Sequence, residues 1–456
     1  LHIPFPMAKN KSVYVCQNCG AESPKWIGHC PACHEWNSYR EEIIAAAPAS
    51  AAKRDATRRK PELLSGIEAN ENDRITSGIG EVDRILGGGM VRGSLVLMGG
   101  EPGIGKSTLA LQIALATQGR TVLYVSGEES ESQVKLRAKR LEGNNDRCFI
   151  YNETEPESVL TQAGAIKPEL LIIDSIQTLS SSMLESSAGS VTQVRECAAM
   201  MLRYAKESGV PVILIGHITK DGTLAGPKVL EHIVDVVLQF EGDGNYVFRI
   251  LRPVKNRFGS TAEIGIFEMG SKGLREVTDP SELFIRRDRD PASGVTIAAT
   301  VDGVRPFLIE TQSLVSSAVY GTPQRSSTGF DTRRLNMLLA VLEKRAGFRL
   351  GVKDVFLNIA GGLKVSDPAI DMAVAAAVLS SNLDVPVDHH TAFAAEVGLS
   401  GEVRPVARIE QRIMEAARMG FSEMVISGFH RDVREVPGLK ISKVYKIEGL
   451  VKLLFS

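Results

Sequence analysis

One glycine-rich run constrains the fold of this chain more than any other segment. Residues 100–107 read Gly-Glu-Pro-Gly-Ile-Gly-Lys-Ser, which fits the phosphate-binding pattern G-x-x-x-x-G-K-[ST]. Residues 94–99 are apolar enough to predict a buried strand before the run, and residues 107–117 predict a helix after it. Glycines let backbone N–H groups converge on a phosphate at a helix N-terminus. The run therefore predicts an α/β domain that binds a nucleoside triphosphate.

The side chains of this run have separate expected roles. Lys106 can reach the β- and γ-phosphates of ATP, and the Ser107 hydroxyl can bind Mg²⁺. The residues expected to contact the nucleotide are Gly100, Glu101, Pro102, Gly103, Ile104, Gly105, Lys106, Ser107 and Thr108.

Two carboxylates follow the next expected strand, residues 121–126. Glu128 and Glu129 come at the carboxyl end of that strand, where a carboxylate can orient and polarise an attacking water. Either residue is therefore a candidate catalytic base. The alternative is an acidic pair that stabilises the N-terminus of a helix over residues 130–141.

Two further strands end in polar residues. Residues 170–174 form an apolar run that ends in Asp174, the Walker B pattern, which is expected to hold Mg²⁺. The strand at residues 210–215 leads to His217, which could sense the γ-phosphate or be an ordinary core or loop histidine. Polar segments at 180–192 and 220–228 leave the same edge of the predicted sheet, and such loops are usually functional.

Four cysteines near the N-terminus form two C-x-x-C pairs, a spacing typical of a tetrahedral Zn²⁺ site. The expected ligands are Cys16, Cys19, Cys30 and Cys33. His29 and His34 adjoin these cysteines and could substitute, although the spacing is complete without them. Trp26 and Trp36 are expected to cover this small module, whose core is too small to fold without metal.

Length and composition indicate a multidomain globular protein. The chain has 456 residues, 43% of them hydrophobic, a net charge of −1, and no apolar run long enough to span a bilayer. Few cysteines lie outside the cluster, which favours a reducing cytosol.

The expected segments are a cloning remnant and tail (1–10), zinc finger (11–40), basic linker (41–73), ATPase domain (74–275), second linker (276–290) and C-terminal domain (291–456). The basic linker is either a solvated tether or a phosphate-contacting arm.

A basic motif, Lys255-Asn256-Arg257-Phe258-Gly259, lies far along the chain from the glycine-rich run. Lys255 and Arg257, two apart on a strand, would point to one face and could neutralise charge on a transferring phosphoryl group. Because these residues are far from the P-loop in the sequence, the phosphoryl group that they neutralise could be bound by a neighbouring subunit. The alternative is a solvated basic strand.

These motifs carry a resemblance. Residues 76–78, Asp83, residues 86–89 and Gly93, together with the P-loop, resemble the RecA/DnaB group of oligomeric ATPases, in which two loops grip single-stranded DNA in a central channel. The Lys255–Gly259 motif, the zinc module and the P-loop together resemble the bacterial RadA (Sms) family over essentially the whole chain. The resemblance implies a hexameric ATP-driven motor of the bacterial cytosol and nucleoid. It would act on single-stranded and branched DNA, and promote branch migration with the RecA recombinase during repair.

The C-terminal region mixes strands and helices and resembles the proteolytic domain of Lon proteases. Lon uses a Ser–Lys dyad, but Ala369 and Glu410 stand at the two dyad positions here. Lys364 and Ser366 lie nearby, but their spacing does not support a relocated dyad. The expectation is an α+β domain without protease activity. A basic set in this domain could contact phosphates or be a solvated face: Lys344, Arg345, Arg349, Lys353 and Lys364.

Two other function classes compete with the DNA motor. A Lon-related protease requires the missing dyad. A KaiC-like signalling ATPase would use the Glu128-Glu129 pair as base, but it leaves the zinc module and the Lys255–Gly259 motif without a role. The effect of nucleic acid on the ATPase rate separates the motor from both.

Overall fold

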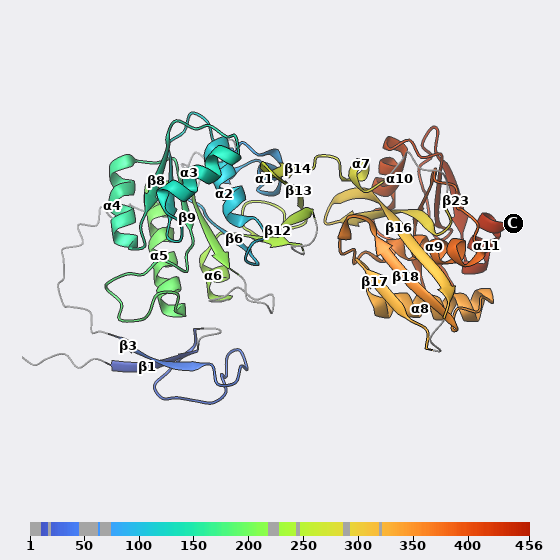
Figure 1. Cartoon of the computed structure of the whole chain (residues 1–456), viewed down its shortest axis with the longest axis horizontal. Coiled ribbons are helices and arrows are strands. Elements are labelled where there is room, and N and C mark those ends of the chain that lie inside the picture. The colour runs from blue at the N-terminus through green and yellow to red at the C-terminus, as the bar shows by residue number, and fades with distance from the viewer. Residues whose placement is uncertain are drawn as a thin grey trace, which may run out of the picture. The chain divides into compact units, whose positions relative to one another are not determined.

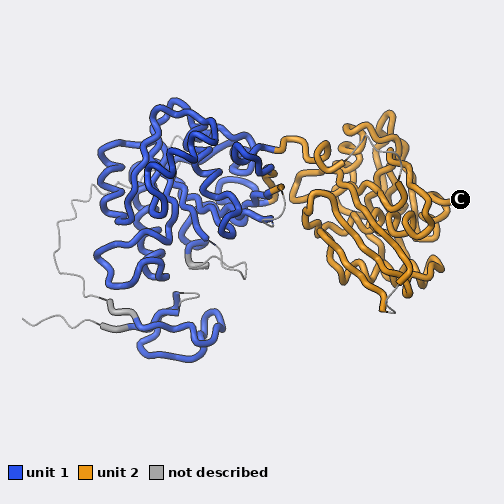
Figure 2. Tube along the Cα trace, in the orientation of Figure 1, with its two compact units in different colours: residues 1–244, 249–261, 267–276 blue, residues 245–248, 262–266, 277–456 orange. Residues whose placement is uncertain are grey.

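The computed structural model describes residues 11–16, 20–44, 63, 74–217, 228–242, 247–285, 292–318 and 322–456. Cys19, the basic linker apart from residues 41–44 and Leu63, and most of the predicted loop at 220–228 lie outside the described residues. The chain divides into two compact units (Figure 2). Unit 1 comprises residues 1–244, 249–261 and 267–276, and unit 2 comprises residues 245–248, 262–266 and 277–456.

The N-terminal module of unit 1 is a small antiparallel sheet in the order β2-β1-β3. Its strands are β1 (Lys11–Cys16), β2 (Glu22–Ser23) and β3 (Tyr39–Ile44). Cys16, Cys30 and Tyr39 form its buried centre.

The rest of unit 1 is built on a nine-stranded sheet in the order β14-β13-β12-β11-β6-β10-β9-β7-β8 (Figure 1). The strands from β8 to β11 in that order are parallel, and β12 is antiparallel to β11. The strands are β6 (Leu95–Gly100), β7 (Val122–Ser126), β8 (Cys148–Asn152), β9 (Leu170–Asp174), β10 (Val212–His217), β11 (Val236–Glu241), β12 (Phe248–Asn256), β13 (Gly265–Gly270) and β14 (Gly273–Glu276). A short pair, β4 (Arg74–Ile75) and β5 (Met90–Val91), lies apart from this sheet.

Helices cover both faces of the parallel strands, and therefore the strands are apolar at nearly every position. Along β6, Val96 and Met98 join a core with α1 (Gly80–Ile85), α2 (Lys106–Ala116) and α3 (Glu131–Arg140). Leu95 and Leu97 point the other way, into a core with α4 (Pro156–Ile166), α5 (Val191–Ser208) and α6 (Lys228–Ile233). This alternation confirms the predicted α/β architecture.

The parallel register brings the predicted nucleotide residues to one sheet edge. Gly100 pairs with His217, and Ser126 pairs with Asp174. The carboxyl ends of four strands, β6, β10, β9 and β7, therefore meet where open α/β sheets bind ligands.

Unit 2 contains a seven-stranded mixed sheet in the order β17-β18-β16-β15-β19-β22-β23. The strands are β15 (Val295–Asp302), β16 (Arg305–Ser317), β17 (Arg325–Thr328), β18 (Lys353–Ile359), β19 (Thr391–Ala394), β22 (Glu423–Ser427) and β23 (Lys440–Val444), and a hairpin pairs β20 (Glu396–Val397) with β21 (Val403–Arg404). The helices are α7 (Pro280–Phe284), α8 (Thr332–Ala346), α9 (Asp371–Leu383), α10 (Ile409–Arg418) and α11 (Ile447–Phe455), with short 3₁₀ turns η2 (Ala360–Gly362) and η3 (Pro368–Ile370).

Neighbouring residues of β15 face opposite layers of unit 2. Ile297 packs in the core that α10 completes, whereas Thr296 donates to the carbonyl of Ala373 in α9. All residues of α9 from Asp371 to Ser380 are buried. The architecture is therefore α+β with the sheet between helical layers, as expected for the C-terminal domain.

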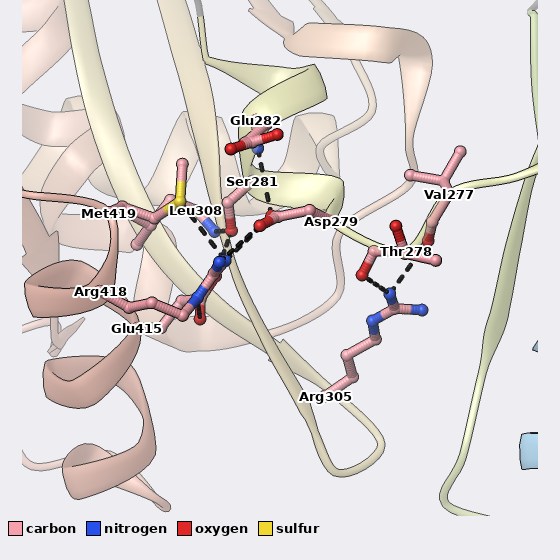
Figure 3. A network of polar contacts seen from close by, with 10 residues as sticks. All are labelled: Val277, Thr278, Asp279, Ser281, Glu282, Arg305, Leu308, Glu415, Arg418 and Met419. Carbon is pink, nitrogen blue, oxygen red and sulfur yellow. Dashed lines mark hydrogen bonds and ion pairs between the residues drawn. The ribbon is translucent and has the colours of Figure 1, made fainter.

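Part of the segment predicted as a second linker forms α7, which belongs to unit 2 (Figure 3). Ser281 donates to Glu415 Oε1 at 2.5 Å, and Arg418 pairs with Asp279 at 2.5 Å. Arg305 bonds the carbonyl oxygens of Val277 and Thr278. These contacts fasten the start of unit 2 to α10 and β16.

Among the described residues, no helix is both long and apolar enough to cross a membrane.

Candidate nucleotide and zinc sites

The glycine-rich run forms a tight loop between β6 and α2. Gly103 and Gly105 have φ angles of +77° and +115°, which glycine adopts without steric cost. A Cβ at Gly105 would lie 2.8 Å from the terminal methyl of Met269, which would have to move aside. Gly105 is also the N-cap residue of α2, which directs the free N–H groups of the helix into the loop. The loop therefore fits a phosphate group.

Lys106 is folded back over the loop with its side chain buried at 3% exposure. Its Nζ donates to the carbonyl oxygens of Gly100 and Glu101, each at 2.8 Å. Burial lowers the pKa of this amine to about 8, and the negative charges of Asp174, Glu128 and Glu101 oppose that shift. A phosphate would supply the counter-charge that the buried amine needs.

Asp174, at the end of β9, faces the first turn of α2. Its carboxylate accepts from Ser107 Oγ at 3.0 Å and from Tyr124 OH at 2.6 Å. Burial raises the pKa of Asp174, and the two donated hydrogen bonds oppose that rise. A hydroxyl and a carboxylate this close are the ligand types that Mg²⁺ prefers, so the pair fits the cation. Sequence reasoning missed Tyr124 because it lies inside an apolar strand.

The structure separates the two candidate bases. Glu128 Oε1 accepts from Ser175 Oγ at 2.8 Å and lies 3.3 Å from His217 Nε2. His217 Nδ1 is buried and has no hydrogen-bond partner among the described residues. Glu128 thus lies at the edge that carries Lys106 and Asp174, together with His217.

Glu129 is held by a different partner. Its carboxylate forms an ion pair with Arg137 of α3, and its backbone carbonyl accepts from Asn152 at 2.7 Å. The N-cap of α3 is Ser130, which forms a capping box with Gln133. The helix is therefore capped without either glutamate.

The polar segment before α5 is tied down by one buried side chain. Gln193, fully buried, accepts from the backbone N–H of Ser181 and donates to the carbonyl oxygens of Ser181, Leu184 and Ser186. The segment leaves β9 just after Asp174, which places its start at the nucleotide edge.

Lys255 lies level with the middle of β6, and Arg257 lies level with the start of β6, away from the P-loop. Lys255 pairs with Val237, which pairs with Leu97, and Arg257 N–H bonds Asp235 O, level with Leu95 at the start of β6. Arg257 is therefore separated from Gly100 by about 16 Å along the strands. Its guanidinium, 55% exposed, lies 3.3 Å from Asp235, and Lys255 Nζ donates to the carbonyls of Glu231 and Val234. Because β12 ends at Asn256, Arg257 follows the strand and does not lie on it as the sequence suggested.

Three of the four cysteines predicted to bind zinc lie in the described residues, and they come together in the N-terminal module. The Sγ atoms of Cys16, Cys30 and Cys33 lie within 4.8 Å of one another, and those of Cys16 and Cys33 are 3.7 Å apart. Two thiolates on a tetrahedral Zn²⁺ are about 3.8 Å apart, so the arrangement fits zinc. Ser38 Oγ and Tyr39 OH lie beside these sulfurs and can donate to thiolates.

The aromatic residues of this module differ from expectation. Trp26 and Trp36 are 53% and 70% exposed, so they do not cover the core as predicted. His29 packs against the rings of His34 and Trp36 and lies outside the thiol cluster. Cys16, Cys30 and Tyr39 fill the centre of this small module, so the two indoles lie at its surface.

In unit 2, an ion pair occupies the region of the lost protease dyad. Asp367 Oδ1 accepts from the N–H of Ala369, and its Oδ2 lies 2.7 Å from Arg412, which is 3% exposed. Glu410 is exposed at the start of α10. Ala369 is buried and carries no nucleophile.

Comparisons with known proteins agree with this organisation. Family models match a rubredoxin metal-binding domain at residues 14–41, an AAA domain at 59–223 and subunit ChlI of Mg-chelatase at 312–428. DNA repair protein RadA of Bacillus subtilis is 49% identical over 93% of this chain and 94% of its own length. This chain belongs to the RadA family of DNA repair proteins. RadA of Streptococcus pyogenes serotype M6 is 46% identical over 99% of this chain and 100% of its own.

Two solved structures similar to this RadA family member each cover less than half of it. The RadB recombinase is 21% identical, with a TM-score of 0.37 over 44% of this chain and 99% of that one. A KaiC-like protein of Pyrococcus horikoshii is 24% identical, with a TM-score of 0.38 over 45% of this chain and 98% of that one.

Proposed function

We propose that this protein is a DNA-dependent ATPase that forms a hexameric ring and moves along single-stranded and branched DNA. In this proposal it promotes branch migration with the RecA recombinase during DNA repair in the bacterial cytosol. The relatives named DNA repair protein RadA support the biological role. The P-loop, Asp174 and Glu128, gathered at one sheet edge, support ATP hydrolysis.

The main support for a ring is the location of Lys255 and Arg257. Arg257 lies level with the start of β6, at the end away from the P-loop of its own chain, and pairs with Asp235. The Lys255 ammonium is directed to the carbonyls of Glu231 and Val234 and not to that P-loop. In a ring they would neutralise the transferring phosphoryl group bound by the next subunit. Each ATP site would then combine Lys106, Ser107 and Asp174 of one subunit with Lys255 and Arg257 of its neighbour.

Within one subunit, Glu128 is the proposed base. Glu129 is neutralised by Arg137, whereas Glu128 lies with His217 beside the phosphate loop. Ser107 and Asp174 would hold Mg²⁺, which when bound neutralises charge on the phosphates. His217, whose Nδ1 is buried without a partner among the described residues, would sense the γ-phosphate.

Unit 2 would serve assembly or DNA binding. Neither Ala369 nor Glu410 can act as a dyad member, and the Asp367–Arg412 ion pair lies in that region. Peptide hydrolysis is therefore not part of the proposal.

The first test is steady-state ATP hydrolysis by the zinc-loaded protein with and without single-stranded DNA. We expect stimulation of several-fold or more, and Lys106→Ala should abolish turnover in both conditions. An unchanged rate, with no DNA binding in a filter assay, would overturn the motor and favour a signalling ATPase. Retained turnover in Lys106→Ala would instead overturn the P-loop assignment.

A further inference from the structure

Two strands converge on one oxygen of the proposed base. Ser175 directly follows β9, which ends at Asp174, and its hydroxyl donates to Glu128 Oε1 at 2.8 Å. His217, the last residue of β10, brings Nε2 to 3.3 Å from the same atom. Both contacts fall on Oε1, so Oε2 stays available to accept a proton from water. None of the sequence patterns identified Ser175.

We propose that Ser175 is a positioning residue that holds Glu128 in its catalytic orientation. The proposal rests on the proposed function, in which Glu128 is the base. The Glu128 side chain is 47% exposed, so its own packing constrains it little. A hydrogen bond from a fixed donor selects one orientation of the carboxylate, which shortens the search for a reactive geometry with water.

Ser175 is a fixed donor because its backbone is held by other residues. It is fully buried, and its carbonyl accepts from Thr178 Oγ1 at 2.7 Å. The next residue, Ile176, donates to the carbonyl of Ile215 in β10 at 2.9 Å. The hydroxyl therefore aims at Glu128 from a rigid turn, and removing it should leave the turn in place.

Gly127, the residue before Glu128, lies directly against this turn. Gly127 N–H donates to Asp174 O at 2.8 Å, and a Cβ on Gly127 would lie 2.0 Å from Thr178 Oγ1. Only glycine permits this approach, which places the following residue, Glu128, against Ser175. The turn also begins the polar segment that Gln193 ties down. The Glu128 contact thus joins the phosphate edge to that segment.

Unit 2 offers a matched control. Ser281 is also fully buried and also donates its hydroxyl to a glutamate, Glu415, at 2.5 Å (Figure 3). Ser281→Ala removes the same hydroxyl and the same type of hydrogen bond from a region without nucleotide residues, together with the hydrogen bond that Ser281 Oγ accepts from the N–H of Leu308. It reports what the loss of a buried Ser–Glu contact does to stability alone.

The experiment measures kcat and KM for ATP in the full-length wild type, Ser175→Ala, Ser281→Ala and Glu128→Gln, together with melting temperatures. For Ser175→Ala we expect kcat to fall about tenfold, with KM for ATP within about twofold of wild type. A misplaced base slows the reaction of bound ATP and leaves ATP binding unchanged. Ser281→Ala should keep the wild-type kcat and KM.

The other charged groups that act on Glu128 are unchanged in Ser175→Ala. Lys106 of α2, Asp174 of β9 and His217 of β10 interact with its carboxylate, and all three remain in the variant. A fall in kcat with an unchanged KM therefore reports the loss of the serine hydroxyl itself.

Three results would contradict either the positioning role of Ser175 or the role of Glu128 as base. Wild-type kcat in Ser175→Ala would overturn the positioning role, as would a fall in kcat that comes with an equal change in KM or with a melting temperature below that of Ser281→Ala. Glu128→Gln with wild-type turnover would overturn the base itself, a failure of the proposed function. An inactive Glu128→Gln together with an unaffected Ser175→Ala would contradict only the inference about Ser175.

Discussion

At the residue scale, burial controls the chemistry of the candidate nucleotide site. Lys106 and Asp174 are 3% and 7% exposed, and burial shifts the pKa of each toward its neutral form. Each therefore gains from a ligand of opposite charge: phosphate for the amine and a cation for the carboxylate.

This burial predicts pH-dependent ATP binding. The pKa of Lys106 is lowered to about 8, so the amine of the free protein loses its proton as pH rises through that value. ATP binds the ammonium form better, and binding therefore takes up a proton above pH 8. The Kd for ATP should be nearly constant below pH 8 and rise toward tenfold per pH unit above it.

Binding of a fluorescent ATP analogue between pH 6.5 and 9.5 checks this expectation. Lys106→Arg is the control, because a guanidinium stays charged over the whole range. A constant Kd for the wild type up to pH 9.5 would contradict the prediction.

At the element scale, the sheet presents two chemically different edges. The carboxyl ends of β6, β7, β9 and β10 carry the phosphate loop and the carboxylates, whereas the amino end of β6 lies level with Arg257. A closed ring of identical subunits can bring opposite edges together, since its interfaces are heterologous.

The two edges predict complementation between inactive variants. Arg257→Ala should lower ATP turnover at least tenfold, because it removes a positive charge from the transferring group. Mixing it with Lys106→Ala subunits should restore part of the activity, since some interfaces then combine an intact P-loop with an intact arginine. Turnover measured across mixing ratios checks this. Activity that follows simple dilution at every ratio would argue against a shared site.

The zinc module predicts a local effect of metal removal. Its core holds little beyond cysteines and Tyr39, so the metal should provide much of its folding free energy. The chain has two tryptophans, Trp26 and Trp36, and both belong to this module. Chelation should therefore change tryptophan fluorescence as zinc is released, while nucleotide binding by the P-loop persists. Unchanged fluorescence after complete zinc release would contradict this expectation.

At the scale of the whole molecule, the two units have separate cores. Unit 2 contains an ion pair between Arg412, which is buried, and Asp367, which is partly buried. Asp367 also accepts from Thr300 Oγ1 and from the N–H of Val301. Removing its carboxylate would leave a buried guanidinium without its counter-charge.

Asp367→Ala should therefore destabilise unit 2 by about 3–5 kcal/mol. In calorimetry, an ATP analogue should raise the melting transition of unit 1 and thereby identify it. The variant should lower the other transition and leave ATP affinity unchanged. Asp388→Ala, which removes an exposed carboxylate from the same unit, is the control. A fall in the nucleotide-sensitive transition would contradict the separation.

The sequence by itself determined the P-loop with its flanking strand and helix, the apolar strand ending in Asp174, and the C-x-x-C pairs of the zinc module. These features depend on residues close together in the chain, where spacing and apolar periodicity carry the information. Similarity over the whole chain also showed the family.

Only the tertiary structure decided which groups meet. It placed Glu129 against Arg137 and Glu128 against Ser175 and His217, a distinction that two adjacent glutamates do not reveal in sequence. It set Arg257 at the edge away from its own P-loop and left Trp26 and Trp36 exposed. These outcomes depend on strand register and on contacts between segments far apart in the chain, and local patterns do not encode such contacts.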